Sequence, residues 1–178
     1  MNATMNIAML IVACKRVEGR KKLQKIVHIL QCCGFGRDFP HQFGYLHYGP
    51  YSHEVKADID GLTNPAGPLV EESEATAGLG YRTFAYSPSL GLKEALEGSS
   101  ESASWAPLAR QLNQKSPQEL EAVSTVLYLK RSGVADSAIK ERFCQLKPAL
   151  ADRFGSTTQF VATLSGSVLN SSGASGCG

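Results

Sequence analysis

The chain has 178 residues, of which 43% are hydrophobic and 19% charged, with a formal net charge of +2. This composition is typical of a folded protein with a substantial core, and it excludes a chain that is disordered throughout. A charge this close to zero is not typical of a protein that wraps nucleic acid. The longest apolar run, Ile7 to Cys14, has eight residues. Because a membrane-spanning helix needs about 20, we expect no membrane partner.

The cysteines and the N-terminal segment predict a cytoplasmic protein. The five cysteines are odd in number and have no repeated spacing, unlike a disulfide framework. The basic residues Lys15 and Arg16 follow the apolar run, whereas a secretory signal carries its positive charge before that run. We therefore expect reduced cysteines and a cytoplasmic location.

Two helices are predicted within the first 35 residues. Apolar residues recur at helical spacing from Ile7 to Val17, and Glu18 and Gly19 end this first helix. The second helix is predicted to stop at Gly34. Its apolar residues follow an i, i+3, i+4, i+7 pattern and are Leu23, Ile26, Val27 and Leu30.

A short aromatic strand and a third helix are predicted next. Residues 43–48 alternate in the manner of a strand, and Gly49-Pro50-Tyr51 is predicted to turn the chain. Ser52 is a suitable N-cap for the third helix. The apolar residues predicted to be buried on this helix are Val55, Ile59 and Leu62.

The next segment predicts a β-hairpin, with strands over 69–76 and 81–87 joined by a turn over 77–80. The order helix, helix, strand, helix, hairpin is typical of a winged-helix domain. We therefore expect a mostly α protein with a small antiparallel β-hairpin, an α+β class, whose winged-helix-like domain covers residues 1–96.

The rest of the chain predicts a helical extension. Residues 97–104 are rich in serine and glutamate and are interpreted as a linker, and residues 105–153 as C-terminal helices beginning near Ser116 and Asp136. The single tryptophan, Trp105, is interpreted as a pin between these helices and the domain, or alternatively as an interface anchor. Residues 154–178 are rich in glycine, serine and threonine and predict a flexible tail.

The sequence does not predict an enzyme, a metal site or a cofactor. Four histidines and the pair Cys32-Cys33 lack the spacing of zinc ligands. A dyad of Cys33 with His41 or His47 has no local signature to support it, and no phosphate-binding or nucleophile-elbow motif occurs. We expect no catalytic residues.

Two segments resemble the YwgA-like family of bacterial proteins: Gly19-Arg20-Lys21-Lys22-Leu23-Gln24-Lys25-Ile26-Val27 and His47-Tyr48-Gly49-Pro50-Tyr51-Ser52. They are more distantly similar to the Panacea (SocA-type) antitoxin-like domain. The resemblance covers roughly residues 5 to 153 and includes Leu146-Lys147-Pro148. It implies a winged-helix-like core without enzymatic activity, and a regulatory or adaptor role with a protein partner.

Charge on the third helix and the hairpin argues against the usual winged-helix mode of DNA binding. In that mode the third helix enters the major groove and the wing contacts the backbone. Phosphates are held by lysine and arginine, but these two elements carry six acidic residues against two basic ones. The acidic residues are Glu54, Asp58, Asp60, Glu71, Glu72 and Glu74, and the basic ones are Lys56 and Arg82.

A basic cluster at the junction of the first two helices, together with two tyrosines beside the Gly-Pro turn, forms the candidate binding surface. Its residues are Lys15, Arg16, Arg20, Lys21, Lys22, Lys25, Tyr48 and Tyr51. The helical spacing predicts that Lys21, Lys22 and Lys25 point away from the core. An acidic protein partner is the first hypothesis, a DNA-binding transcriptional regulator using residues 15–25 is the alternative, and an enzyme ranks third. Without any function, the cluster would be a solvated corner of the protein. The C-terminal helices could also mediate a homo-oligomer.

Overall fold

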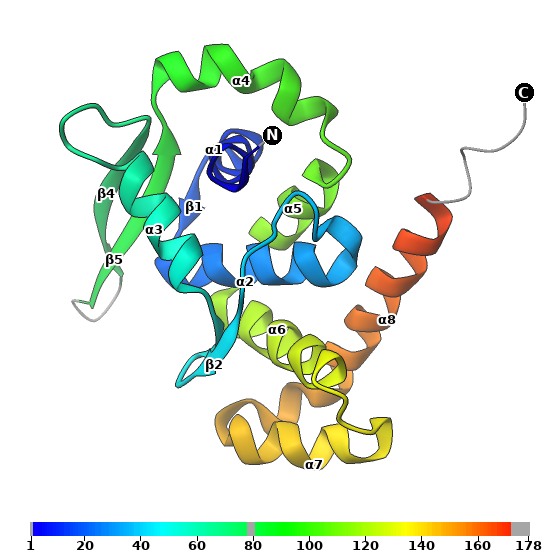
Figure 1. Ribbon diagram of the computed structural model, residues 1–178. Helices are drawn as coiled ribbons and strands as arrows, with labels where there is room; N and C mark the ends of the chain where they lie inside the picture. Colours follow the sequence, from blue (N-terminus) through cyan, green and yellow to red (C-terminus); the bar gives the residue numbers. More distant parts are fainter. Residues whose placement is uncertain (1, 78–80, 172–178) are drawn as a thin grey trace, which may run out of the picture.

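The computed structural model describes residues 2–77 and 81–171, which form a mostly helical structure with two small antiparallel sheets (Figure 1). The mostly α, α+β class predicted from the sequence is therefore confirmed. The helices are α1 (Ala3–Cys14), α2 (Arg20–Leu30), α3 (His53–Leu62), α4 (Leu90–Ser102), α5 (Ala106–Asn113), α6 (Pro117–Arg131), α7 (Asp136–Leu146) and α8 (Phe154–Ser171). Two short segments, the π-helical η1 (Gln31–Phe35) and the 3-10 helix η2 (Pro148–Arg153), complete the helical part.

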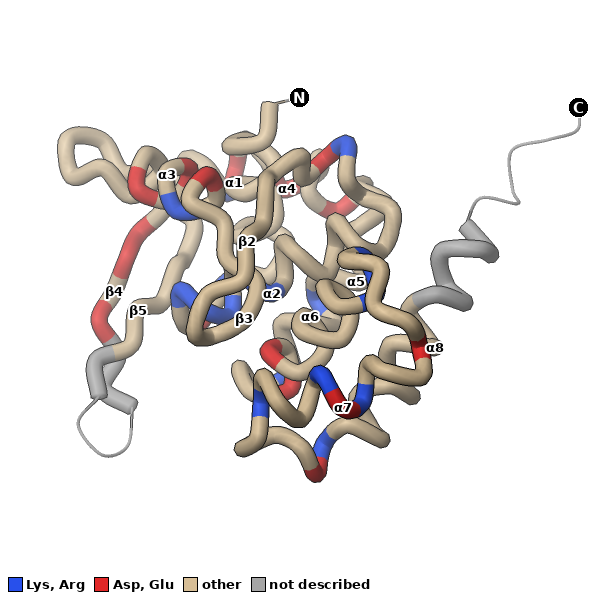
Figure 2. The backbone as a smooth tube through the Cα atoms, turned by 60° about the horizontal axis from the view of Figure 1, so that its bottom comes forward, with Lys and Arg blue, Asp and Glu red and all other residues tan. Residues whose placement is uncertain are grey.

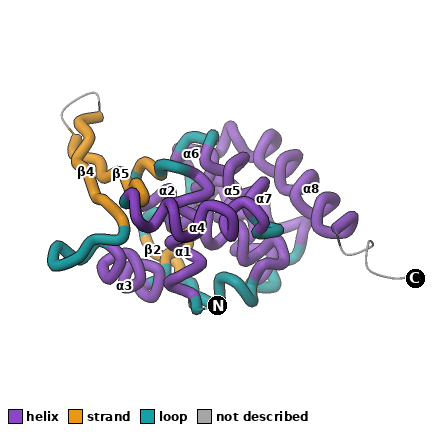
Figure 3. The backbone as a smooth tube through the Cα atoms, turned by 90° about the horizontal axis from the view of Figure 1, so that it is seen from above, coloured by secondary structure: helices purple, strands orange, loops and turns teal. Residues whose placement is uncertain are grey.

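The strands form two separate sheets. In the larger sheet, β5 (Tyr81–Pro88) lies between β1 (Val17–Glu18) and β4 (Val70–Ala77), and both pairings are antiparallel. In the smaller sheet, β2 (Gly44–Leu46) pairs with β3 (Gly49–Tyr51). Figure 3 shows the β4–β5 ribbon at one end of the molecule and α8 at the other. The predicted turn residues 78–80 lie outside the described residues.

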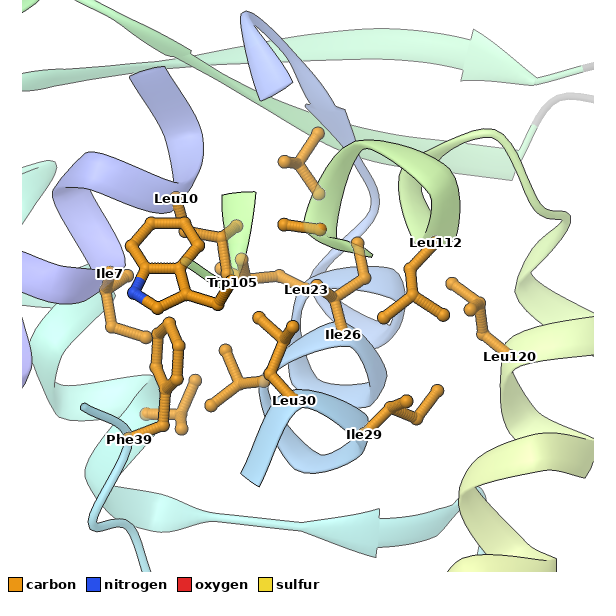
Figure 4. Packing of buried hydrophobic residues seen from close by; sticks show 14 of the residues in the cluster. Ile7, Leu10, Leu23, Ile26, Ile29, Leu30, Phe39, Trp105, Leu112 and Leu120 are labelled. Atoms are coloured by element: carbon orange, nitrogen blue, oxygen red, sulfur yellow. The ribbon is translucent and has the colours of Figure 1, made fainter. Parts of the chain in front are cut away.

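The core forms around α1 and α2 (Figure 4). Helix α1 is apolar on all sides, and residues 6–13 are buried among α3, α4, α5 and β5. Helix α2 is amphipathic and buries Leu23, Ile26, Val27 and Leu30. The same core contains Val55, Ile59 and Leu62 of α3. The buried faces predicted for these two helices are thus confirmed.

The prediction that the first helix extends to Val17 is wrong. The helix ends at Cys14, and Lys15 takes a positive φ of 63° that directs the chain away from the helix axis. Val17 then pairs with Tyr86 and Glu18 with Ala85, so this segment becomes the third strand of the larger sheet. A long-range pairing replaces what would have been one more helical turn.

The prediction that Gly49-Pro50-Tyr51 forms a turn is also wrong. These residues form β3, and the turn of the hairpin is at His47 and Tyr48. Ser52 follows as the predicted N-cap of α3, since its hydroxyl accepts a hydrogen bond from the amide of Val55 at 3.3 Å.

Residues 97–104, predicted as a linker, are helical as far as Ser102 because they belong to α4. Leu92 and Ser100 are buried and Leu96 is half-buried, so one residue per turn faces the core on the side of α1. The hydroxyl of Ser100 is accommodated by donating to the carbonyl of Glu97 at 2.9 Å. The polar composition thus belongs to the exposed face of an amphipathic helix.

Residues 154–171 of the predicted flexible tail form helix α8, which packs against α6. Thr157, Val161 and Leu164 are buried at helical spacing, and Phe154 and Phe160 lie against the core. Residues 172–178 lie outside the described residues. Among the described helices, none combines the length and the apolar character needed to cross a membrane.

Trp105 is a pin within the core, as predicted. Its side chain is buried and meets the ring of Phe39 edge-on, with 5.3 Å between the ring centroids (Figure 4). Residues on both sides of positions 97–104 belong to one hydrophobic cluster. Packing of the C-terminal helices is therefore continuous with packing of the N-terminal ones.

We predict that Leu30→Ala lowers the free energy of unfolding by about 2–5 kcal/mol, because Leu30 is fully buried and its truncation leaves a cavity. Urea denaturation followed by circular dichroism measures this change. Leu90→Ala is the control, since Leu90 is 71% exposed and its truncation should change stability by no more than about 0.5 kcal/mol. Equal stabilities of the two variants would contradict the packing described here.

Candidate functional site

Side chains of α2 satisfy backbone groups at the end of the β2–β3 hairpin. The side-chain amide of Gln24 donates to the carbonyl of Ser52 at 2.9 Å, and its carbonyl accepts from the amide of Ser52, also at 2.9 Å. Both residues are buried. Gln24 thus makes the pair of hydrogen bonds that a neighbouring strand would make, and both backbone groups of Ser52 are paired.

Lys25 holds the preceding residue of the same segment. Its ammonium group donates to the carbonyl of Pro50 at 2.5 Å, and the residue is only 3% exposed. Burial lowers the pKa of Lys25 to about 8, although attraction to Glu121 acts in the opposite direction. The prediction that Lys25 points outward is therefore wrong, because the hairpin packs over this side of α2.

A second buried lysine reaches the hairpin from the C-terminal part of the chain. Lys147 donates to the carbonyl of His47 at 3.0 Å and pairs with Glu121 of α6 at 2.5 Å. Its side chain is 6% exposed and that of Glu121 is 20% exposed. The three segments on which the family resemblance was based, around residues 24, 50 and 147, therefore meet at one hairpin.

Glycine is required at position 49 for two reasons. Its φ is +86°, a region that residues with a side chain rarely adopt. A Cβ atom there would also lie 3.2 Å from the hydroxyl of Thr125 and 3.7 Å from the amine of Lys25. The hairpin can therefore lie close against α2 and α6 only with glycine at this position.

A cavity of about 310 Å³ lies between α2, α3 and the hairpin, with Tyr86 of β5 also in its wall. Leu23, Val55 and Ile59 contribute apolar surface to it. Four basic residues and one acidic residue also line it: Arg20, Lys21, Lys25, Lys56 and Asp60. The site is thus an apolar hollow with an excess of positive charge.

The rim of the cavity includes two exposed hydrophobic residues of the hairpin. Leu46 is 49% exposed and Tyr48 is 57% exposed. The amine of Lys21 lies 3.1 Å from the centroid of the Tyr48 ring, which makes a cation–π contact across the rim. Figure 2 shows the basic residues at the start of α2 beside this hairpin and the acidic residues on α3 and β4.

Of the eight residues in the candidate binding surface, five line this cavity: Arg20, Lys21, Lys25, Tyr48 and Tyr51. Arg20 is held in place by Tyr86 and Glu72, with donor–acceptor distances of 3.1 and 3.0 Å. Its guanidinium also lies 3.9 Å from the centroid of the Phe84 ring. Part of the positive charge of the cluster is thus neutralised within the protein.

The other three residues lie elsewhere. Lys15 and Arg16 are exposed beyond the end of α1, and Arg16 pairs with Glu18 at 3.2 Å. The amine of Lys22 donates to the carbonyl of Asn113 at the end of α5. The basic cluster is therefore not one continuous outward face.

Several residues of this site could not be predicted from the sequence. Leu46 and Tyr86 line the cavity, and Gln24, Glu121 and Lys147 hold the hairpin. Gln24 and Lys147 do lie in the segments that carry the family resemblance. Nothing in the spacing of these segments along the sequence predicts that they contact one another in the fold.

The histidines and cysteines do not form a metal centre in the described part of the chain, where no three metal-ligating side chains come together. His28 is buried, with Nδ1 2.8 Å from the hydroxyl of Ser124 and Nε2 3.6 Å from the thiol of Cys32. Burial lowers the pKa of His28 to about 3 and raises the pKa of Cys32. His41 pairs with Asp58 at 2.8 Å.

We predict that Gln24→Leu destabilises the protein by about 1–3 kcal/mol, because it leaves the buried amide of Ser52 unpaired, whereas the carbonyl of Ser52 keeps its hydrogen bond from the amide of Lys56. Urea denaturation measures the loss. Gln111→Leu is the control, because Gln111 is exposed on α5. A Gln24→Leu protein as stable as this control would show that water replaces the side-chain amide at no cost.

We also predict that titration of Lys25 makes the free energy of unfolding depend on pH. Its pKa is about 8 in the folded protein and 10.5 ordinarily, so between these values the unfolded chain binds more protons than the folded one. Stability must then rise with pH across this window, by up to about 3 kcal/mol.

The measured quantity is the free energy of unfolding of the parent minus that of Lys25→Met, as a function of pH. Groups that titrate in both proteins cancel in this difference. Lys140→Met, which removes an exposed amine, should give a flat difference from the parent. A flat difference for Lys25→Met as well would refute the lowered pKa.

Comparison with known proteins identifies the family of this chain. No family model matches it. It is 32% identical over 130 residues to "Uncharacterized protein YwgA" of Bacillus subtilis, and the alignment covers 72% of this chain and 74% of the relative. An identity at this level over most of both proteins reflects a common fold and origin. The chain therefore belongs to the YwgA family.

Proposed function

We propose that this protein is a non-enzymatic regulatory module that binds a partner protein at the cavity beside the β2–β3 hairpin. The observation that carries the proposal is the combination, at one place, of an apolar hollow, exposed Leu46 and Tyr48, and an excess of basic residues. Exposed large apolar residues beside a cavity are a feature of binding surfaces. The excess charge favours an acidic partner.

The absence of enzymatic activity remains part of the proposal. Cys32 lies 3.6 Å from Nε2 of the buried His28, and its own partial burial raises the pKa of the thiol. A thiol with a raised pKa is a poor nucleophile at neutral pH. This chemistry supports a binding role over a catalytic one.

The order of the elements supports a winged-helix-like core. Helices α1, α2 and α3 are followed by the β4–β5 ribbon, which would be the wing, and β1 adds a third strand to it. The resemblance to the Panacea domain, whose members neutralise toxins or serve as adaptors, favours a protein partner for such a core.

A DNA-binding regulator is the second candidate, and the same order of elements favours it. The charges oppose it, because Glu54, Asp58 and Asp60 lie on α3 and the exposed residues 71, 72 and 74 of β4 are acidic (Figure 2). Burial of Lys25 and the internal contacts of Arg20 and Lys22 also reduce the charge available to phosphates.

Site-specific photo-crosslinking in cells tests the proposal. A photoreactive phenylalanine analogue at Tyr48 should form a discrete protein adduct, because Tyr48 is 57% exposed at the rim. The same analogue at Leu90, which is 71% exposed on α4, is the matched control and should form none.

Purified protein should also leave duplex DNA unshifted in a gel at about 150 mM salt. Adducts at neither position, or equal adducts at both, would contradict binding at the cavity. A DNA shift abolished by Lys15→Glu combined with Arg16→Glu would favour the second candidate instead.

A further inference from the structure

A second hollow lies beside the first at the hairpin. It has a volume of about 410 Å³ and is lined by residues 42–44, His53 and Glu54 together with Leu46 and Tyr51. The last two residues also line the first cavity. Because the two hollows share Leu46 and Tyr51, they lie side by side at the β2–β3 hairpin, and together they are called the groove here.

The face of the hairpin between the hollows is open. Gly44 and Leu46 lie two residues apart on β2 and so share a face, and Gly44 is paired with Tyr51. A Cβ atom at Gly44 would meet nothing within 4 Å. Tyr45 belongs to the opposite face, where its ring lies 5.3 Å from that of Tyr128. The groove therefore passes over Gly44, next to the large side chains of Leu46 and Tyr51.

The two ends of the groove differ in charge. The first cavity has four basic residues and one acidic residue in its wall, whereas the second has Glu54 and neither lysine nor arginine. Among the described residues, neither Lys21 nor Lys25 has an ion-pair partner, but Lys25 is buried and donates to the carbonyl of Pro50, whereas Lys21 is exposed and its amine lies against the ring of Tyr48. Arg20 and Lys56 are paired with Glu72 and Asp60. Lys21 is thus the cation most available to an incoming anion.

We infer that the partner contributes an extended segment that crosses the hairpin in this groove. A large apolar side chain of the segment fills the first cavity, and an aspartate or glutamate beside it pairs with Lys21. The rest of the segment passes over Gly44 toward Glu54. The length of the groove favours a peptide over a compact small molecule, because one small anion would occupy only the first cavity. This inference rests on the proposed function and specifies the partner of that site.

The probe is a phage-displayed library of random peptides, selected on the immobilised full chain. Enriched sequences should share an acidic residue next to a large apolar one. A synthetic peptide of that sequence, measured by isothermal titration calorimetry, should bind Lys21→Glu about tenfold more weakly than the parent. Changing the acidic residue of the peptide to lysine should restore binding to Lys21→Glu. Lys140→Glu, on the exposed side of α7, should bind as the parent does.

Gly44→Phe tests the extended path. The site has room for a side chain and an ordinary φ, so this variant should fold normally while blocking the groove and weakening the peptide about tenfold. Gly98→Phe, in an equally open position on α4, should bind unchanged. Matched circular dichroism spectra and urea midpoints of both variants confirm that they fold.

The outcomes separate this inference from the proposed function. Peptides sensitive to Lys21→Glu but not to Gly44→Phe would place the ligand in the first cavity alone and overturn the extended path. Enriched peptides without acidic residues, or insensitive to both changes, would overturn the inference while protein adducts at Tyr48 still upheld the function. No enriched peptide together with no adduct at Tyr48 would overturn both.

Discussion

The structure depends on how the backbone of Pro50 and Ser52 obtains its hydrogen bonds. These residues are buried beside α2, and within the described part of the chain the small sheet has no third strand to pair with them. Gln24 and Lys25 take the place of that strand with three hydrogen bonds from side chains. Proline suits its position because it has no amide hydrogen that would need a further acceptor. The segments 19–27 and 47–52 thus occur together in the sequence because side chains of the first bind the backbone of the second.

These hydrogen bonds from α2 to the hairpin determine which side chains remain available for binding a partner. Gln24, Lys25 and Lys147 are used internally to hold the base of the hairpin, and they are buried. Lys21, Leu46 and Tyr48 lie at the tip or above it and stay accessible. A rigid base with an exposed apolar tip avoids much of the entropy cost of ordering a loop when a partner binds. The same hairpin therefore serves stability at one end and recognition at the other.

Features determined by local chemistry could be predicted from the sequence, and features determined by long-range contacts could not. Helical spacing identified the buried residues of α2 and α3, and serine chemistry identified the caps at Ser52 and Ser116. Lys25 occupies a flanking position of its helix, and only packing of the hairpin and of α6 makes it buried. Composition suggested a linker at 97–104, but contact with α1 stabilises a helix there. Five of the eight residues proposed for binding came together, yet the apolar wall that completes the cavity includes Tyr86 from a distant strand.

The burial of Trp105 has a practical consequence for spectroscopy. It is the single tryptophan of the chain, it packs on Phe39, and it does not line either hollow of the groove. Its fluorescence therefore reports the integrity of the core, and its emission should shift to longer wavelength only when the helices separate. The groove is lined by Tyr48 and Tyr51 instead. Tryptophan emission thus follows folding of the core separately from binding at the hairpin.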